Sequence, residues 1–516
     1  MAQPGPRVQS SGGKAIDTPA SRCARLRRCL AGSSEDVLNK RTSFNAASVL
    51  AFCLVAILTC FGEPGSGKYA AVAAEKPNIL FVLTDDADLS LIGEMPEIRE
   101  RLMEMGTTFP NAFAPFATCC PSRSTILRGQ YPHNHGVVAN YGAFGGVGRY
   151  REMGDDKDNV ATRLDAAGYE TGLFGKYLNG YRGGYVPPGW DSWHAAAGGY
   201  QNMTTYEEDG YKKHDFKSRH ETDVYGDKAK QFVTANKGRP WFAYVAFHSP
   251  HSPTYFEDRY AKEYATAVAP KPSSFDERDV SDKPEWIRRL PRVSDADTKG
   301  YDLSHRHRLR AMRSVDDTVV DLLNTLTKTG QSENTYIVLW NDNGYHMGQH
   351  RIPKGKRTAY EEDVRYPLVI RGPGVKRGAR DARLVSGADL LPTFLDMAGV
   401  ATPDYADGRS LVPLLSGAGD VGWRDALLLE GYDDGFSKKE YVPPDFKAIR
   451  TSDGRVFVQY ETGEEELYHL DADRNQTQSL HEKSAYSEEI EELSDRLATL
   501  KDCSAAGCRT AEATNP

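Results

Sequence analysis

KPNILFVLTDD, residues 76–86, is a continuous apolar run that ends in two adjacent carboxylates. Such a run is typical of a parallel strand that is buried on both faces of a sheet. Open α/β sheets place their ligand sites at the carboxyl ends of strands, so Asp85 and Asp86 are candidate ligand residues. Considered alone, this pair is equally compatible with a solvated turn.

Two other apolar runs end in the same way. WFAYVAF (241–247) is followed by His251, and YIVLW (336–340) is followed by Asp342 and Asn343. Because parallel strands of one sheet share a carboxyl edge, we expect these polar side chains to converge with the first pair. Oxygen ligands suit a hard cation such as Ca²⁺ or Mg²⁺ better than zinc. The candidate metal ligands are Asp85, Asp86, Asp342 and Asn343.

The rest of the sequence predicts an α/β body followed by a smaller unit. Buried-strand patterns alternate with amphipathic segments, and the stretch 252–300, rich in Pro, Asp and Lys, is interpreted as a long surface excursion. Toward the C-terminus, short alternating segments separated by Asp-Gly and Thr-Gly turns predict a small antiparallel sheet. We therefore expect a catalytic domain at 76–420 and a C-terminal subdomain at 421–516. The expected helices are 95–106, 159–168, 309–329, 389–399 and 487–500, and the other expected strands are 169–174, 366–370, 447–450, 455–460 and 465–470.

The first 75 residues differ in character from the rest. They are basic up to Arg41 and then run into an apolar stretch at 46–62. A stretch of this length lies between the core of a secretory signal and a membrane-spanning helix. Small residues at 71–73 offer a cleavage site, so a signal peptide is the first interpretation and an uncleaved N-terminal anchor is the alternative. Either way, we expect the body of the protein to be exported: secreted, periplasmic or at the cell surface.

Cysteine usage agrees with export. Of eight cysteines, four lie in the leader, and Cys503 and Cys508 have a spacing that a local disulfide could close in an oxidising compartment. Cys119 and Cys120 are then left alone in the mature domain, and no cysteine pattern indicates zinc. The net charge of -8 and the lack of a long basic stretch beyond the N-terminus argue against nucleic-acid binding.

CCPSRSTILRG, residues 119–129, contains the two cysteines of the mature domain. Pro121 is well placed to open a helix, and Cys119 just before it would lie where a helix N-terminus favours an anion. Arg123 would lie one turn into the helix. A nucleophile beside a cation at a helix start is suited to stabilising an oxyanion. The alternative is a buried and inert cysteine pair, which is the commoner fate of cysteines.

The same stretch resembles the signature of the sulfatase family, Cys-x-Pro-Ser-Arg followed by Leu-x-Gly. Other blocks similar to that family follow in family order over residues 76–475, including GLFGKYLNGY, AFHSPHSP and WNDNGYHMGQH. The resemblance implies an α/β, alkaline-phosphatase-like sandwich. Its large sheet would be mixed, mostly parallel and flanked by helices, and a small C-terminal antiparallel sheet with a helix would follow.

The resemblance also implies the chemistry. Cys119 would be oxidised to formylglycine by a formylglycine-generating enzyme, and one hydroxyl of its hydrate would attack the sulfur of a sulfate ester. The second hydroxyl would then expel sulfate. One Ca²⁺ ion would be held by Asp85, Asp86, Asp342 and Asn343, with the formylglycine at position 119 completing its shell.

Four basic residues take roles by the same resemblance. Arg123 would support the nucleophile, whereas Lys176 and Lys356 would contact the sulfate. His251 would contact the sulfate and assist the leaving oxygen. Three further histidines have open roles: His346 would line the site or pack behind Asp342, and His133 and His135 would be structural or on the substrate side.

One block departs from the usual family pattern. Many sulfatases have a histidine two residues after the lysine of the Gly-Lys block, where this chain has Leu178; Asn179 is a candidate for that polar role. GKYLNGY and CCPSR are more similar to the branch of N-acetylglucosamine-6-sulfatases and heparan endosulfatases. A sulfated glycan such as 6-sulfated N-acetylglucosamine is the substrate this implies, with an aryl sulfate as an option. A phosphoesterase or phosphonate monoester hydrolase of the same superfamily, and a catalytically silent binder of sulfated glycans, remain alternatives.

Overall fold

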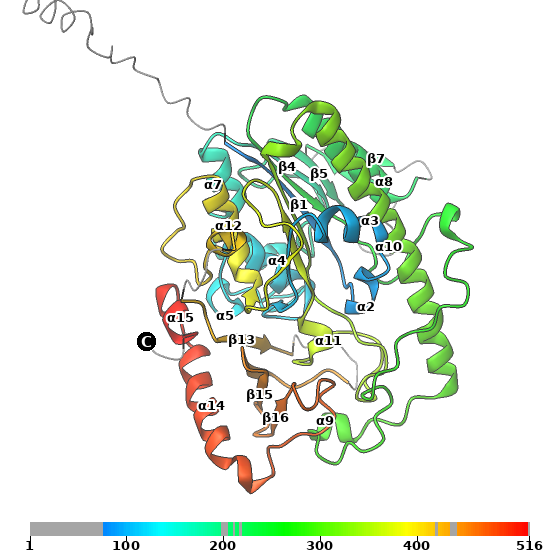
Figure 1. Ribbon diagram of the computed structural model, residues 1–516, viewed down its shortest axis with the longest axis vertical. Helices are drawn as coiled ribbons and strands as arrows, with labels where there is room; N and C mark the ends of the chain where they lie inside the picture. The colour runs from blue at the N-terminus through cyan, green and yellow to red at the C-terminus, as the bar shows by residue number, and fades with distance from the viewer. Residues whose placement is uncertain are drawn as a thin grey trace, which may run out of the picture. The chain divides into compact units, whose positions relative to one another are not determined.

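A central mixed sheet organises the fold, and among the described residues it has ten strands (Figure 1). The order is β11-β2-β10-β9-β1-β8-β4-β5-β6-β7. The central strands β9 to β5 all run parallel, whereas β10, β6 and β7 add antiparallel pairs. The strands are β1 (Asn78–Thr84), β2 (Thr107–Phe109), β4 (Glu170–Gly175), β5 (Ser192–Ala196), β6 (Thr205–Glu208), β7 (Lys212–Asp215), β8 (Trp241–Ala246), β9 (Thr335–Asn341), β10 (Leu368–Arg371) and β11 (Ala379–Arg380).

The structure is a computed structural model, and it describes residues 76–197, 205–209, 212–215, 219–417, 422–433 and 441–513. The expected leader lies outside these residues, so its interpretation stays a prediction. No helix in the described segments combines the length and the apolar character needed to cross a bilayer.

Register brings the ends of three strands to one level. Leu83 of β1 pairs with Trp340 of β9 on one side and with Ala246 of β8 on the other. Residues that follow these strands therefore emerge side by side at the carboxyl edge, although they are far apart in sequence. The expected convergence of the three strand ends is confirmed.

Helices cover both faces of the sheet, which explains why its central strands are apolar throughout (Figure 1). On one face, Phe81 and Phe242 pack against Phe394 of α12, with ring centroids 5.1 and 5.5 Å away. On the other face, Trp241 and Phe174 pack against Phe232 of α8. The main helices are α4 (Cys119–Arg128), α7 (Val160–Ala166), α8 (Glu221–Ala235), α10 (Asp295–Thr329) and α12 (Leu390–Met397).

A second, antiparallel sheet in the order β13-β14-β15-β16 forms the C-terminal part. Its strands are β13 (Ala426–Gly431), β14 (Phe446–Thr451), β15 (Arg455–Tyr460) and β16 (Glu465–His469). Leu493 and Leu497 of α14 (Ser487–Leu500) pack in one buried cluster with Leu428 and Ile449 of this sheet. The α/β fold with a small C-terminal sheet and helix is confirmed, whereas the boundary near residue 420 remains a prediction.

Short elements complete the chain. They are α2 (Leu89–Ile92), α3 (Pro96–Ile98), α5 (Pro132–His135), α6 (Gly146–Glu152), α9 (Glu285–Arg288), α11 (Glu361–Val364), α13 (Val412–Leu415), α15 (Ala506–Ala511), β3 (Ala112–Phe113), β12 (Val385–Ser386) and the η segments Arg99–Met103, Asp155–Lys157, Asp258–Tyr260, Ser332–Asn334, Gly387–Asp389 and Ser484–Tyr486.

Three sequence expectations need correction. The segment expected as one helix at 95–106 is α3 followed by a π-helical turn, Arg99–Met103. The strand expected at 366–370 is the shorter β10, which runs antiparallel to β9. The surface excursion ends at residue 294, because α10 begins at Asp295 rather than near residue 309. Ser294 caps this helix by accepting a hydrogen bond from the Asp297 N–H, so a polar first turn without an apolar stripe is helical nonetheless.

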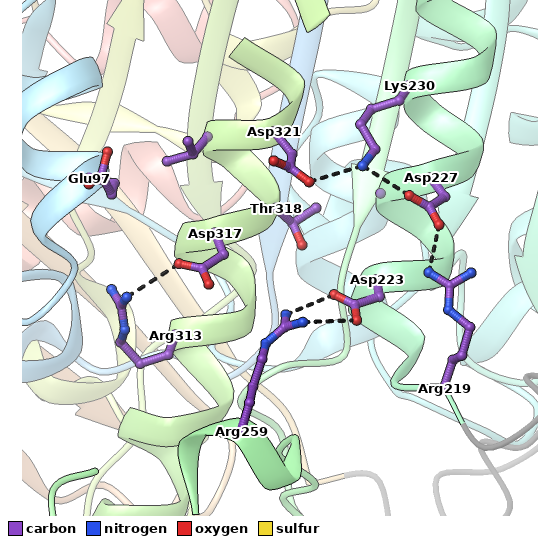
Figure 2. Close-up of a pocket in the computed structure, with 12 residues that line it drawn as sticks. Glu97, Arg219, Asp223, Asp227, Lys230, Arg259, Arg313, Asp317, Thr318 and Asp321 are labelled. Atoms are coloured by element: carbon purple, nitrogen blue, oxygen red, sulfur yellow. Dashed lines mark hydrogen bonds and ion pairs between the residues drawn. The ribbon is translucent and has the colours of Figure 1, made fainter. Parts of the chain in front are cut away.

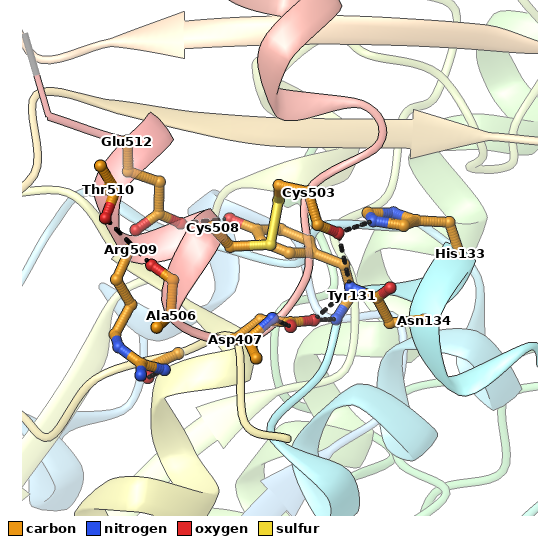
Figure 3. Close-up of a disulfide and its surroundings, with 12 residues drawn as sticks. Tyr131, His133, Asn134, Asp407, Cys503, Ala506, Cys508, Arg509, Thr510 and Glu512 are labelled. Carbon is orange, nitrogen blue, oxygen red and sulfur yellow. Dashed lines mark hydrogen bonds between the residues drawn. A yellow bond between two sulfur atoms is a disulfide. The ribbon is translucent and has the colours of Figure 1, made fainter. Parts of the chain in front are cut away.

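The expected disulfide between Cys503 and Cys508 is present and closes a turn that ends inside α15 (Figure 3). The turn packs on α5: Nε2 of His133 lies 2.8 Å from the Cys503 carbonyl oxygen, and the Asn134 side chain donates to the same oxygen. Asp407 accepts hydrogen bonds from the Asn134 side chain and from the backbone N–H of Ala505. The C-terminal turn is thereby fastened to the segment that follows α4.

Removal of this disulfide should cost stability without changing the chemistry. A bridge with a sequence separation of 5 closes a short loop, for which chain entropy gives about 2 kcal/mol. We expect the double variant Cys503→Ala, Cys508→Ala to lower the free energy of unfolding by that amount in urea titrations while kcat of the folded protein stays at its wild-type value. A drop in kcat with unchanged stability would contradict this assignment.

Candidate active site

Helix α4 places Cys119 at the carboxyl edge of the sheet. Thr118 precedes the helix in an extended conformation, and Gly129 ends it with a φ of 67°. Cys119 is the first residue of the helix rather than the residue before it, a small correction that keeps its side chain at the positive end of the helix dipole. Only 1% of Cys119 is exposed.

The four expected metal ligands lie around this cysteine. The Sγ atom of Cys119 lies 3.5 Å from Oδ1 of Asp85. The Nδ2 of Asn343 donates to Oδ1 of Asp86 at 2.8 Å, and the backbone N–H of Asp86 donates to Oδ1 of Asp342 at 3.1 Å. Asp86 itself adopts a φ of 62°, a left-handed backbone conformation that turns the chain directly after β1.

His251 joins the same cluster. Its Nε2 lies 3.4 Å from Oδ2 of Asp86. Within the described residues, Asp85, Asp86, Cys119 and His251 each offer a ligand atom, and these atoms lie within 4.8 Å of one another. The predicted metal ligands and His251 therefore lie together at one edge of the sheet.

Three cations face the carboxylates. Arg123 donates through Nε to Asp342 at 2.9 Å, and its Nη2 lies 3.8 Å from Asp85. Lys176 forms a buried ion pair with Asp85. With Lys356 and the three Asp side chains, the site holds three cations and three carboxylates.

The position of Lys356 tests whether a cation fits among the oxygen ligands. Its Nζ lies 2.7 Å from Cys119 Sγ and 3.4 Å from Asn343 Oδ1, and it also contacts Asp86 Oδ1. A positive charge thus lies against the predicted ligands from two strand ends and from residue 119. Hard oxygen donors of this kind suit Ca²⁺. The residues present fit such an ion.

Burial and charge set the protonation states. Burial raises the pKa of Cys119 to about 11, despite the nearby Lys176 and Lys356, so the unmodified thiol stays protonated at neutral pH. Burial opposes ionisation of Asp85, but Lys176 and His251 lower its pKa well below the ordinary value. Burial and the neighbouring Asp85 raise the pKa of Asp342 to about 6.

The pKa of His251 is lowered to about 4, chiefly by burial. His251 is therefore a neutral imidazole at pH 7 in the absence of an added charge. A neutral imidazole can still donate one hydrogen bond through a ring N–H.

Two further residues, Arg308 and Asn341, support the site, and only Asn341 lies in a block that the sequence analysis singles out. The guanidinium of Arg308 donates from α10 to the carbonyl oxygen of Asp86 and to the carboxylate of Asp88. Asn341 accepts from the backbone N–H of Ala87 and donates to its carbonyl oxygen, which fixes the turn after β1. The apolar pattern predicts this helix only from residue 309, so it does not identify Arg308.

A second supporting pair is Glu221 with His248. The carboxylate of Glu221 contacts the His248 ring and accepts from the His248 backbone N–H at 3.1 Å. The loop that contains His251 is thereby anchored to the start of α8. Nothing in the sequence relates these two residues, because 27 positions separate them.

The uncertain histidines have structural partners. His346 lies 2.8 Å from Asp363 through Nδ1 and 2.8 Å from the Pro353 carbonyl through Nε2. His135 contacts Thr125 and the backbone N–H of Val137. The imidazole rings of His346 and His135 therefore both make contacts within the protein.

Asn179 is buried near the site, whereas Leu178 belongs to the apolar core. Oδ1 of Asn179 has no hydrogen-bond partner among the described residues, and its Nδ2 lies 3.5 Å from the Tyr141 hydroxyl. Asn179 lines a small cavity together with Lys176 and His248. The proposed polar role of Asn179 stays a prediction.

This fold, with an acidic ligand set and a helix-start cysteine on its carboxyl edge, is an α/β fold of the alkaline-phosphatase-like class. The sulfatase family model matches residues 77–400, and the model for the C-terminal region of N-sulphoglucosamine sulphohydrolase matches residues 348–503. The chain belongs to the sulfatase family, and it is a sulfuric ester hydrolase.

Individual relatives agree with the branch indicated by the motifs. The human N-acetylglucosamine-6-sulfatase is 32% identical over 503 residues, covering 89% of this chain and 90% of the relative. An extracellular sulfatase SULF-1 homolog from Drosophila melanogaster is 36% identical over 372 residues, covering 69% of this chain and 33% of that protein.

A solved structure in complex with its substrate D-glucosamine-2-N,6-O-disulfate has a similar fold. Its TM-score is 0.70 at 26% sequence identity, and the match covers 83% of this chain and 98% of the other.

Proposed function

We propose that the protein hydrolyses sulfate esters of glycans with a formylglycine made from Cys119 and one Ca²⁺ ion held by Asp85, Asp86, Asp342 and Asn343. The observation that carries this proposal is the place of Cys119, which starts α4 and lies within 3.5 Å of both Asp85 and Lys356. An unmodified thiol there is a poor nucleophile, since burial raises the pKa of Cys119 to about 11.

Charge balance explains why such a site would attract a sulfate ester. The charges of three carboxylates and three cations cancel, so a bound Ca²⁺ ion would leave the pocket positive. When bound, the ion withdraws charge from sulfate oxygens and from the nucleophile. Lys176 and Lys356 contact the sulfate in this proposal, and Arg123 holds Asp85 and Asp342 in place.

His251 assists the leaving oxygen. It lies beside Asp86 at 3.4 Å, on the loop that Glu221 and His248 fix to α8. As a neutral imidazole, it donates a hydrogen bond to the oxygen on which negative charge develops.

Conversion of Cys119 requires a formylglycine-generating enzyme. Because only 1% of Cys119 is exposed, that enzyme must reach it before the chain is folded. Export of the protein is proposed as well, on the basis of the leader and the Cys503–Cys508 disulfide.

The substrate that we propose is a 6-sulfated N-acetylglucosamine in a glycan. Parallel assays of sulfate and phosphate release would test the reaction: from N-acetylglucosamine 6-sulfate, from an aryl sulfate and from the matching phosphate esters. We expect sulfate release from the sugar ester at the highest kcat/KM. Faster release of phosphate than of sulfate would favour a phosphoesterase, and sulfate release from the aryl ester alone would refute the glycan substrate.

Calcium should bind in a one-to-one ratio and stabilise the fold. At a free concentration of 100 times Kd, a ligand that binds only the native state adds about 2.7 kcal/mol. We expect Ca²⁺ to raise the Tm of the metal-depleted protein, and Asp86→Ala to abolish that rise. Asp381→Ala is the matched control, because Asp381 pairs with Arg383 outside the site. An equal rise of Tm in Asp86→Ala would rule out the proposed ligand set.

A further inference from the structure

A cavity of about 150 Å³ lies next to the residues assigned to the reaction. Ser252 in its wall follows His251 directly, and Lys354 precedes Lys356 by two positions. Consecutive Cα atoms are about 3.8 Å apart, so the wall of this cavity is built on the same two backbone segments that carry His251 and Lys356. We call it the Lys354 pocket, and its lining residues are Ser252, Thr254, Gly300, Leu303, Ser304, His307 and Lys354.

The lining of the Lys354 pocket is basic and polar. None of the described residues that line it is acidic. Lys354 is exposed and makes no ion pair with the described part of the chain, so its ammonium group is available to a ligand. His307 packs against Phe256 in a tilted arrangement with ring centroids 5.0 Å apart, which holds the imidazole in the wall.

The surroundings add positive charge and an apolar contact. Burial lowers the pKa of His307, and the neighbouring cations Arg310, Arg306 and Lys354 lower it further. Leu303 is 47% exposed at the wall and offers apolar surface for the face of a sugar ring.

A larger cavity, of about 480 Å³ between α8 and α10, makes a useful contrast (Figure 2). Each cation that lines this cavity forms an ion pair with a carboxylate of the same cavity, so its charge is already compensated and is not available to bind an anion. The pairs are Arg259 with Asp223, Arg313 with Asp317, Arg219 with Asp227, and Lys230 with Asp227 and Asp321. Size alone therefore does not identify an anion site in this protein.

We propose that the Lys354 pocket binds an anionic group, a carboxylate or a sulfate, on the sugar linked to the unit that loses its sulfate. The preferred substrate is then an oligosaccharide with a second negative charge rather than a monosaccharide. This inference rests on the proposed function, because it extends the substrate of that same site by one sugar. Lys354 supplies the charge, and Ser252, Ser304 and His307 supply hydrogen bonds.

The test compares two disaccharides that differ in a single group. Both contain glucosamine 6-sulfate; in one, the neighbouring sugar is a uronate, and in the other its carboxylate is reduced to the neutral alcohol. A third substrate replaces the carboxylate with a sulfate ester on the neighbouring sugar. The measured quantity is the ratio of kcat/KM for each charged disaccharide to kcat/KM for the neutral one.

We expect the wild-type ratio to exceed one and Lys354→Gln to lower it roughly fivefold, the range of a partly exposed ion pair. The loss should fall on KM, and Lys354→Arg should restore most of the ratio. Lys237→Gln, an exposed lysine beyond the end of α8, is the matched control and should leave the ratio unchanged.

Two failures are distinguishable. If the wild type releases no sulfate from any of the three substrates, the proposed function itself fails. If it hydrolyses all three and the ratio is unaffected by Lys354→Gln, the inference about the Lys354 pocket is overturned while the proposed function stands. A ratio that falls equally in Lys237→Gln would also overturn it, because general surface charge would then explain the preference.

Discussion

Cys119→Ala is expected to lower kcat for sulfate-ester hydrolysis by about 10⁴-fold or more, the range for loss of a covalent nucleophile. The side chain starts α4 and contacts both Asp85 and Lys356, so no neighbouring group lies in the same position to replace it. Cys120→Ala provides the control, because Cys120 is buried in the apolar core and its own pKa is raised to about 12 by burial. The folded fraction of Cys120→Ala should retain the wild-type kcat.

A serine at position 119 should behave differently from alanine. With one hydroxyl, Cys119→Ser could accept the sulfate group but would lack the second hydroxyl that expels it. We therefore expect a sulfated protein to accumulate, detectable by intact mass, with at most one turnover per molecule. Sustained multiple turnover by Cys119→Ser would contradict the two-hydroxyl route.

Mass spectrometry of the peptide that contains Cys119 checks the modification directly. An aldehyde or its hydrate is expected at residue 119 in active protein, with Cys120 unmodified. If active protein carries only unmodified cysteine at 119, formylglycine is not the nucleophile.

The site was predictable because its residues lie next to strong local signals. Asp85 and Asp342 directly follow apolar strands, and parallel strands in register bring their ends to one level whatever the sequence separation. Cys119 and Arg123 lie within one short block, so their proximity needs only a helix. These patterns predict that the strand-end acids converge, whereas the roles of Lys176, Lys356 and His251 follow only from the resemblance to the sulfatase family.

Other parts required tertiary contacts that no local pattern contains. His133 lies against the Cys503 carbonyl across 370 positions of sequence. The apolar pattern does not predict the start of α10, because residues 295–308 lack an apolar stripe. It does not identify Arg308 either, since the contact of Arg308 with the Asp86 carbonyl exists only once that helix packs on the sheet. The short strands β2 and β11, at one end of the sheet, are too short to be recognised by alternation.

Charge compensation links this architecture to stability. Buried carboxylates are tolerable only when cations satisfy them, and removing one partner of a buried pair costs about 3–5 kcal/mol. Arg123 is fully buried, its pKa is raised despite burial by Asp342 and Asp85, and it also donates to the Lys176 carbonyl oxygen at 2.9 Å. It therefore joins α4, β4 and the strand-end acids.

Arg123→Met should accordingly lower the free energy of unfolding by about 3–5 kcal/mol and lower kcat roughly 10–100-fold, as loss of a group that orients metal ligands does. Unfolding in urea measures the first effect, and sulfate release by the folded fraction measures the second. Arg123→Lys should recover part of both, because it restores the charge but not the planar fork that reaches Asp342 and the Lys176 carbonyl.

The variant Arg424→Met separates the effect on the free energy of unfolding from the effect on kcat. Arg424 is as deeply buried and pairs with Asp389 and Glu512, away from the strand-end cluster. We expect it to lose a comparable amount of stability with no change in kcat of the folded fraction. If Arg424→Met lowered kcat as much as Arg123→Met, the loss would reflect the fold in general. Arg123 would then have no specific part in holding Asp85 and Asp342 for the reaction.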